Sequence, residues 1–176
     1  TESLLVAAPL RGHRVMVTSV AYSPDGTLMA SGSIDRTIGL WDVARGERIA
    51  VLHGFDPVFS IAFNPDGTRL AAGLNEGRIL LWDVGTGEQL LTMVGHDRKV
   101  SSIDFNHDGT RIVSGSEDGT VRLWDAHTGA ELATVHRADL GVPVRSVAFS
   151  PDGKHLAAAI LLDVLLWTSD GATLRG

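Results

Sequence analysis

The chain of 176 residues contains no cysteine. Disulfide bonds, thiolate metal sites and cysteine nucleophiles are therefore excluded. This absence leaves the compartment open, because a chain without thiols folds in either redox environment. A cytoplasmic location is the default expectation.

The sequence also lacks long runs of one residue type. Lys and Arg together number 15 against 21 Asp and Glu, which gives a net charge of −6, and no basic cluster stands out. No apolar run is long enough to span a membrane, and the first residues lack the basic region of a signal peptide. We therefore expect neither a nucleic-acid partner nor a membrane partner.

Helical periodicity is absent as well, whereas 20 glycines and 6 prolines supply many turn positions. The feature that organises the chain is a recurring tryptophan. All four tryptophans are spaced at intervals of 41, 42 and 43 residues, at Trp41, Trp82, Trp124 and Trp167, and the first three are followed by Asp. Self-similarity at this period indicates one supersecondary unit that is stacked repeatedly.

Each repeat has the same parts in the same order. An alternating apolar stretch comes first, at residues 17–22, 58–63, 100–105 and 144–149. A tight turn that ends in Asp-Gly follows, then a strand rich in small residues, and then the strand that ends in Trp. A second turn leads to an outer strand. The pattern predicts an all-β chain with four strands per repeat.

Two repeats share a longer set of residues, which comprises Gly12, His13, Ser31, Asp35, Trp41 and Asp42 in one copy and Gly95, His96, Ser114, Asp118, Trp124 and Asp125 in the other. The interval from His to Trp is 28 residues in both copies. This pattern resembles the WD-repeat β-propeller family, and the resemblance covers nearly the whole chain. It implies four-stranded antiparallel blades arranged radially around a central channel.

The resemblance also implies a structural hydrogen-bond network in which Trp, Ser, His and Asp of one blade form a chain. The complete sets are His13, Ser31, Asp35 and Trp41, and His96, Ser114, Asp118 and Trp124. The matching positions of the second repeat are Gly54, Ala72 and Glu76, and those of the fourth are Asp139, Ala157 and Leu161. We expect these two blades to lack the polar chain and to rely on apolar packing.

We interpret residues 1–176 as a single WD-repeat array. Residues 1–10 resemble the outer strand of a preceding blade, and the four blades fall at 11–52, 53–94, 95–135 and 136–176. Four blades are too few for the usual ring of the family, and an arc of four would expose its first and last faces. Two copies related by two-fold symmetry would give eight blades, so we expect a homodimer. An open arc and a closed four-bladed ring are the alternatives.

The sequence offers little for catalysis or for metal binding. Ser31, His13 and Asp35 could be drawn as a hydrolase triad, but the network beside the tryptophan is the better interpretation. Seven histidines are spread along the chain without ligand-like spacing, and His53 and His136 lie close to the histidine position but out of register. The glycines serve turns and form no phosphate loop. We expect no catalytic residue, no metal and no cofactor.

Surface recognition remains, and the family's usual partner face carries the loops that lead into each inner strand. An apolar patch of Met16, Ile34, Phe55 and Phe59 would suit an interface hot spot. The other residues expected on this face are Thr18, Pro57, Asn75, Lys99, Ser101, Glu117, Pro143, Arg145 and Ile160.

These observations support two functions. The first is a non-catalytic scaffold that presents a protein or peptide partner on a rigid propeller face. The second is a self-assembling propeller fragment whose main activity is ring closure between copies. An enzyme that uses a cleft of the propeller is a distant third.

Overall fold

The computed structural model describes residues 9–137 and 142–169, and this part of the chain contains fifteen strands and no helix. The strands form four antiparallel sheets, here called blades 1 to 4. Blade 1 contains β1 (Val17–Tyr22), β2 (Leu28–Ser33), β3 (Thr37–Asp42) and β4 (Glu47–His53). Blade 2 contains β5 (Val58–Phe63), β6 (Arg69–Leu74), β7 (Ile79–Asp83) and β8 (Gln89–Met93). Blade 3 contains β9 (Val100–Phe105), β10 (Arg111–Ser116), β11 (Thr120–Asp125) and β12 (Glu131–Arg137). Blade 4 contains β13 (Val144–Phe149), β14 (His155–Ile160) and β15 (Asp163–Thr168).

Turn chemistry sets the register within each blade. In the first turn, Gly26 has a φ of 71° and its N–H donates to the Ser23 carbonyl oxygen at 2.9 Å. The Asp25 carboxylate accepts from the Thr27 N–H at 3.0 Å, which fixes the loop from within. The same backbone hydrogen bond closes the turns at Gly67, Gly109 and Gly153. The all-β prediction and the expected inner strands are confirmed.

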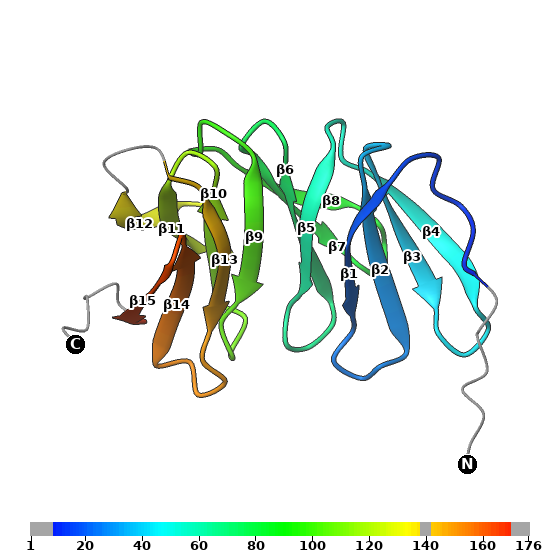
Figure 1. Ribbon diagram of the computed structural model, residues 1–176. Helices are drawn as coiled ribbons and strands as arrows, with labels where there is room; N and C mark the ends of the chain where they lie inside the picture. The colour runs from blue at the N-terminus through cyan, green and yellow to red at the C-terminus, as the bar shows by residue number, and fades with distance from the viewer. Residues whose placement is uncertain (1–8, 138–141, 170–176) are drawn as a thin grey trace, which may run out of the picture.

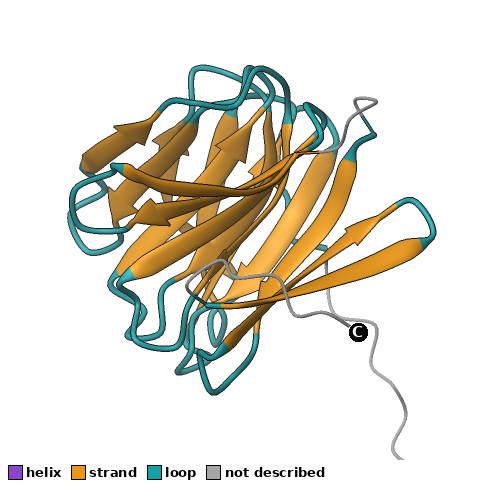
Figure 2. Ribbon diagram, turned by 90° about the vertical axis from the view of Figure 1, so that its left-hand side faces the viewer, coloured by secondary structure: helices purple, strands orange, loops and turns teal. Residues whose placement is uncertain are grey.

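The blades pack side by side in chain order. Figure 1 shows the inner strands β1, β5, β9 and β13 in a row, and Figure 2 shows the same sheets turned by 90°. Three apolar cores lie along this row. One joins blades 1 and 2, the next joins blades 2 and 3, and the last joins blades 3 and 4.

In blades 1, 2 and 3 a glycine in the second strand makes room for a valine of the following blade. A Cβ atom at Gly73 would lie 2.6 Å from Val100 Cγ1, and one at Gly115 would lie 2.5 Å from Val144 Cγ1. Gly32 meets Val58 in the same way, at 2.6 Å. A larger residue would push the blades apart, so these glycines set the distance between sheets.

Serine hydroxyls tie neighbouring inner strands together. Ser19 Oγ accepts from the Ile61 N–H at 3.2 Å, and Ser60 Oγ accepts from the Ile103 N–H at 3.1 Å. Ser102 Oγ accepts from the Val147 N–H at 3.0 Å. One side-chain acceptor therefore recurs at all three junctions between blades.

The first face of blade 1 is uncovered. Val20 of β1 is 62% exposed, whereas the equivalent residues of the next three blades, Ile61, Ile103 and Val147, are 6%, 6% and 5% exposed. Val17 and Tyr22 are exposed on the same strand. In the described part of the chain the blades form an open row, with β1 and β13 at its two ends (Figure 1).

Blade 4 departs from the repeat in its central hairpin. Ile160 pairs with Asp163, so the connection is one residue shorter than in the other blades. Ala158 pairs with Val147 as Ser31 pairs with Val20, which makes Ala158 the equivalent of Ser31. The sequence-based assignment of this place to Ala157 is therefore wrong by one residue. The outer strand expected at the end of blade 4 lies outside the described residues, and so does the strand expected at residues 1–10 except for Pro9 and Leu10.

Candidate protein-interaction site

A continuous chain of hydrogen bonds crosses blade 3 from the core to the surface. Trp124 Nε1–H donates to Ser114 Oγ at 2.7 Å, and Ser114 Oγ lies 2.6 Å from His96 Nε2. His96 Nδ1 lies 2.9 Å from Asp118 Oδ2. These directions are consistent when the serine hydroxyl donates to Nε2 and the ring carries its proton on Nδ1.

Blade 1 contains the same chain. Trp41 Nε1–H donates to Ser31 Oγ at 2.8 Å, His13 Nε2 lies 2.7 Å from that oxygen, and His13 Nδ1 lies 3.0 Å from Asp35 Oδ2. A threonine that sequence reasoning missed completes both networks. Thr37 and Thr120 each donate a hydroxyl to the aspartate at 2.6 Å. Their position two residues after Asp was the available signal.

Both aspartates are held in the ionised form. Burial opposes ionisation of Asp35, but hydrogen bonds from the Thr37 hydroxyl, the Arg14 N–H and the His13 ring lower its pKa far below the usual range. Burial also opposes ionisation of Asp118, and hydrogen bonds from His96 and Thr120 lower its pKa in the same way.

The networks contain the residue types of a hydrolase triad but not the accessibility that one needs. Ser31 and Ser114 are buried, and each hydroxyl oxygen already accepts from a tryptophan N–H inside its blade. A nucleophile requires an open approach to the reacting atom and an oxyanion site beside it. The geometry is that of a buried structural network.

Blade 2 uses a different side chain to accept the hydrogen bond from the backbone N–H in its hairpin. In blade 1 the Ser33 hydroxyl accepts from the Asp35 N–H at 3.0 Å, whereas blade 2 has Leu74 at the serine position. The Asp56 carboxylate supplies the missing acceptor and bonds the Glu76 N–H at 2.6 Å. Ala72 provides no hydroxyl for Trp82, and both residues are buried in the apolar core between blades 1 and 2.

The loops that lead into the inner strands gather at one end of the blades, and two hydrogen bonds join the first two of these loops to the β2–β3 hairpin of blade 1. Ile34 N–H donates to the Met16 carbonyl oxygen at 3.0 Å, and Gly54 N–H donates to the Arg36 carbonyl oxygen at 2.8 Å. Phe55 follows Gly54 and is 75% exposed, with a φ of 61°. This backbone conformation is rare for an aromatic residue.

A second group lies between blades 2 and 3. Lys99 Nζ lies 4.5 Å from the centre of the Phe59 ring and 2.7 Å from Glu117 Oε1. The cation is therefore held between an aromatic face and a carboxylate. Asn75 is exposed on the hairpin of blade 2, beside Glu76. We call Met16, Ile34, Phe55, Phe59 and Lys99 the apolar loop surface.

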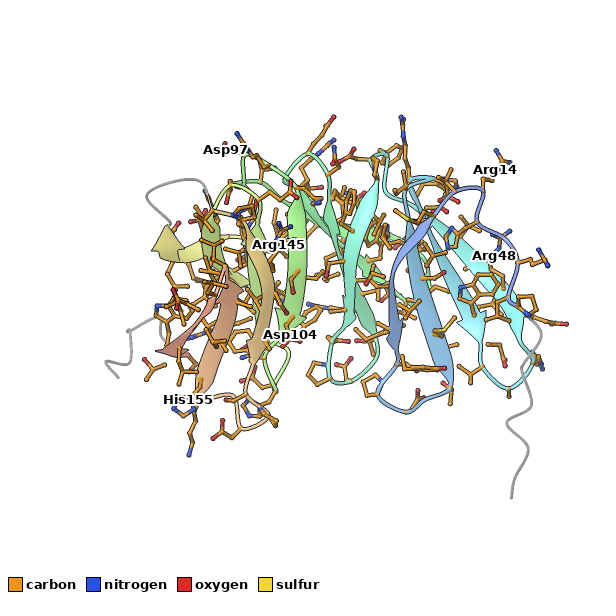
Figure 3. The ribbon with its side chains drawn as sticks, in the orientation of Figure 1. Arg14, Arg48, Asp97, Asp104, Arg145 and His155 are labelled. Atoms are coloured by element: carbon orange, nitrogen blue, oxygen red, sulfur yellow. The ribbon has the colours of Figure 1, made fainter. Side chains whose placement is uncertain are left out.

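Several residues expected on this face point elsewhere. Thr18 Oγ1 donates to the carbonyl oxygens of Gly32 and Val58 at 3.0 and 2.5 Å, so it bridges blades 1 and 2. Ser101 bridges blades 3 and 4 in the same way, through the carbonyl oxygens of Gly115 and Val144. Ile160 is buried within β14, contrary to expectation, because the short hairpin shifts its position. Arg145 is exposed (Figure 3).

Two further polar features escaped sequence reasoning. Asp104 Oδ2 accepts from the Phe149 N–H at 2.8 Å at the junction of blades 3 and 4, and burial raises the pKa of its carboxyl. Arg122 is buried and pairs with Glu131 at 2.7 Å. In the described part of the chain, no three His, Asp or Glu side chains are grouped so as to hold a metal ion. No helix of that part is long and apolar enough to cross a membrane.

Four-stranded antiparallel sheets that pack through their inner strands define a β-propeller array. The chain belongs to the WD domain, G-beta repeat family, whose sequence model matches residues 5–42, 46–83, 87–125 and 131–172. The first three matches end directly after the tryptophan, so the outer strand of each blade falls in the sequence repeat that follows.

Curated proteins match over shorter segments. The chain is 58% identical over 40 residues to Protein Mut11 of Chlamydomonas reinhardtii, and 55% identical over 40 residues to Small ribosomal subunit protein RACK1 of Glycine max. It is 44% identical over 48 residues to Ribosome biogenesis protein BOP1 homolog of Drosophila virilis. These segments cover 23%, 23% and 27% of this chain and 11%, 12% and 6% of the relatives. Two of these relatives are named for the ribosome or its biogenesis, and none of the three bears the name of an enzyme.

Separate replacement of Trp124 and Trp82 tests how much the hydrogen-bond network contributes to stability. Trp124→Phe removes the donor to Ser114 and leaves the buried hydroxyl and His96 underpaired, which we expect to lower the free energy of unfolding by about 1–3 kcal/mol. Trp82→Phe removes a similar volume but no bond to a serine, so its cost should be smaller. Denaturant titration of both variants gives the comparison, and equal midpoint shifts would contradict the prediction.

Acid should unfold the protein partly through Asp35 and Asp118. The pKa of each carboxyl is lower in the folded state than in the unfolded chain, so its stabilisation is present above the unfolded pKa and is lost as the pH falls below that value. We expect the denaturant midpoint to fall steeply below about pH 4. Asp118→Asn should flatten this dependence, and an unchanged slope would show that the network carries no part of it.

Proposed function

We propose that this chain is a non-catalytic scaffold that binds a protein or peptide partner on the apolar loop surface. The family, and relatives named for a ribosomal subunit protein and a ribosome biogenesis protein, support a role in protein interaction. The single observation that carries the choice of surface is Phe55. A left-handed backbone is costly at Phe55, as it also is at Leu161, but at Phe55 it presents an exposed aromatic ring near the loop that carries Met16, which favours a use in binding.

The surroundings of Phe55 suit an interface hot spot. Met16 is 60% exposed on the neighbouring loop, and the Phe59 ring beneath Lys99 adds an aromatic face with a cation. Aromatic residues and methionine are enriched at the centre of interfaces, whereas lysine is depleted there, so Phe55, Met16 and Phe59 would carry most of the affinity. Asn75, Glu117 and Arg145 would form the polar rim in this proposal.

Phe55→Gly separates binding from folding. Glycine adopts the positive φ without strain, so the free energy of unfolding should stay equal or rise by up to about 1 kcal/mol. The variant should nevertheless bind peptides selected on the wild-type chain at least ~10-fold more weakly. Peptide affinities measured by calorimetry, together with denaturant titration, give both quantities.

Leu161→Gly is the matched control, because Leu161 is also 75% exposed and has a φ of 54° but lies in the hairpin of blade 4. Its peptide affinity should equal that of the wild type. If Phe55→Gly and Leu161→Gly bind selected peptides equally well, the partner does not use the apolar loop surface.

A second proposed activity is ring closure between two copies, which would give an eight-bladed homodimer. The observation that favours it is the uncovered face of β1, whose counterparts are buried in every other blade. In blade 4, Ser146 is the equivalent of Ser19, Ser60 and Ser102. Its hydroxyl oxygen could therefore accept a hydrogen bond from a following blade. The Val20 N–H of a second copy would be its donor.

One residue would weaken this junction. Ala159 stands where Gly32, Gly73 and Gly115 accommodate the valine of the following blade. Its methyl group would crowd Val17 of a docking copy, so that strand would have to shift.

Light scattering over a concentration series tests ring closure. We expect a concentration-dependent dimer that Val20→Lys abolishes, because a charge would enter the apolar junction. Ala159→Gly should strengthen the dimer by making room for Val17. Val94→Lys, at an exposed position outside this face, is the control. A monomer for the wild type and for Ala159→Gly would rule out ring closure by a second copy.

A further inference from the structure

The strand position two residues before each tryptophan distinguishes blade 1 from the others. Leu80, Arg122 and Leu165 occupy it in blades 2, 3 and 4, whereas blade 1 has Gly39. Gly39 pairs with Ser31 as Arg122 pairs with Ser114, so the two positions correspond in the sheets. Blade 1 therefore lacks a side chain where each other blade has a large one.

Blade 3 shows what this space can hold. The Arg122 side chain is buried there, with Nε donating to Thr120 Oγ1 at 3.2 Å and Nη1 pairing with Glu131 Oε2 at 2.7 Å. Its Nη1 also lies close to Gly95, at 2.7 Å from the place that a Cβ atom would take. One guanidinium thus fills the space between a threonine, a glutamate and a glycine.

In blade 1 the Arg48 guanidinium takes the place beside the glycine, because a Cβ atom at Gly12 would lie 2.5 Å from Arg48 Nη1. A cavity of about 440 Å³ opens next to this guanidinium. Its walls include Gly12 and Thr37, the equivalents of the glycine and threonine that surround Arg122. The remaining lining residues are Arg14, Asp35, Arg48, Val51 and His53. Figure 3 shows Arg14 and Arg48 on the same side of the molecule, beside the outer strands of blade 1.

The charges around this cavity are the reverse of those in blade 3. Arg48 pairs with Trp41 as Glu131 pairs with Trp124, so an arginine replaces the glutamate that binds Arg122. Arg14 follows His13 as Asp97 follows His96, so a second arginine replaces a second acid. In blade 3 the guanidinium is paired with a glutamate, whereas in blade 1 two arginines line an open cavity.

The arginines are available for a ligand. Arg48 Nη1 donates to the Gly12 carbonyl oxygen at 2.9 Å, and its guanidinium lies 5.8 Å from the centre of the Trp41 ring, which orients the group. Within residues 9–137 and 142–169, neither Arg14 nor Arg48 has a carboxylate oxygen within ion-pair distance.

Asp35 is the one acid that lines this cavity among the described residues, and its oxygens are already occupied. The Thr37 hydroxyl and N–H bind Oδ1, while the Arg14 N–H and the His13 ring bind Oδ2. Its negative charge is therefore offset by four donors within the blade, which reduces its repulsion of an anion.

We propose that this cavity of blade 1 binds a phosphate monoester. Two guanidinium groups match a doubly charged phosphate better than a singly charged carboxylate, and arginine donors suit phosphate oxygens in pairs. The Thr37 hydroxyl and the His53 ring add hydrogen-bonding groups to the walls. The volume exceeds that of a phosphate ion, so it leaves room for the attached group.

Titration with O-phosphoserine tests the proposal. Titrations with serine and with acetate at the same ionic strength are the controls. Backbone and indole N–H signals of the ¹⁵N-labelled chain report the site. Signals of Gly12, Thr37 and the Trp41 indole should shift saturably with O-phosphoserine, with a Kd on the order of millimolar or tighter. Inorganic phosphate should bind to the same residues.

Three variants check the site. Arg48→Glu should weaken O-phosphoserine binding at least ~10-fold, as expected for the loss of a charge-assisted pair and its replacement by a like charge. Gly39→Arg combined with Arg48→Glu copies the pairing of Arg122 with Glu131 and should abolish binding, because the guanidinium beside the cavity is then neutralised by a carboxylate. A Cβ atom at Gly39 would lie 2.9 Å from Trp41 Nε1, so denaturant titration of this variant checks that the chain stays folded. Arg98→Glu, at an exposed arginine in the corresponding loop of blade 3, should leave the affinity unchanged.

Three outcomes would overturn the proposal. They are an absence of saturable shifts up to tens of millimolar O-phosphoserine, equal affinity for acetate and O-phosphoserine, and equal weakening by Arg48→Glu and Arg98→Glu. The last would mean that only the net charge of the surface attracts the anion.

Discussion

The rest of the structure depends on the contact between one blade and the next. A valine at the start of each inner strand enters the space above a glycine of the preceding blade, and a serine hydroxyl fixes the neighbouring backbone N–H. The three apolar cores lie between sheets, so a single blade would expose its core residues to water. Stability in such an array is a sum over neighbouring units and their interfaces.

This arrangement explains why the polar chains can differ among blades. The network of Trp, Ser, His, Asp and Thr ties a loop to the core of its own blade, and it is present in blades 1 and 3. Blade 2 replaces the serine near its hairpin with Leu74 and takes an acceptor from Asp56 instead. Local backbone donors must be satisfied in every blade, but any side chain that reaches them will serve. The contact between blades has no such substitute, and its valine is the same in all three junctions.

The sequence predicted the strands and turns closely because each depends on nearby residues: alternating apolar positions, Pro-Asp-Gly turns and the tryptophan interval. It failed where one residue changed the geometry. The hairpin of blade 4 is one residue short, which moved Ile160 into a buried strand position and made Ala158 the equivalent of Ser31. The inward direction of Thr18 and Ser101 was also missed, since an alternating pattern does not show which polar side chain meets a neighbouring sheet.

A missing side chain leaves still less trace in a sequence. From the sequence alone, Gly39 is one more small residue in a strand, and Arg14 and Arg48 are ordinary surface charges. Only superposition of equivalent positions shows that the place of the Arg122 guanidinium in blade 3 is taken in blade 1 by the Arg48 guanidinium, beside an open cavity. A buried cation in one repeat thus shows what the equivalent place in another repeat can hold. The same backbone holds a bound guanidinium in blade 3 and an open basic cavity in blade 1, so recognition chemistry can vary from blade to blade while the junctions preserve the fold.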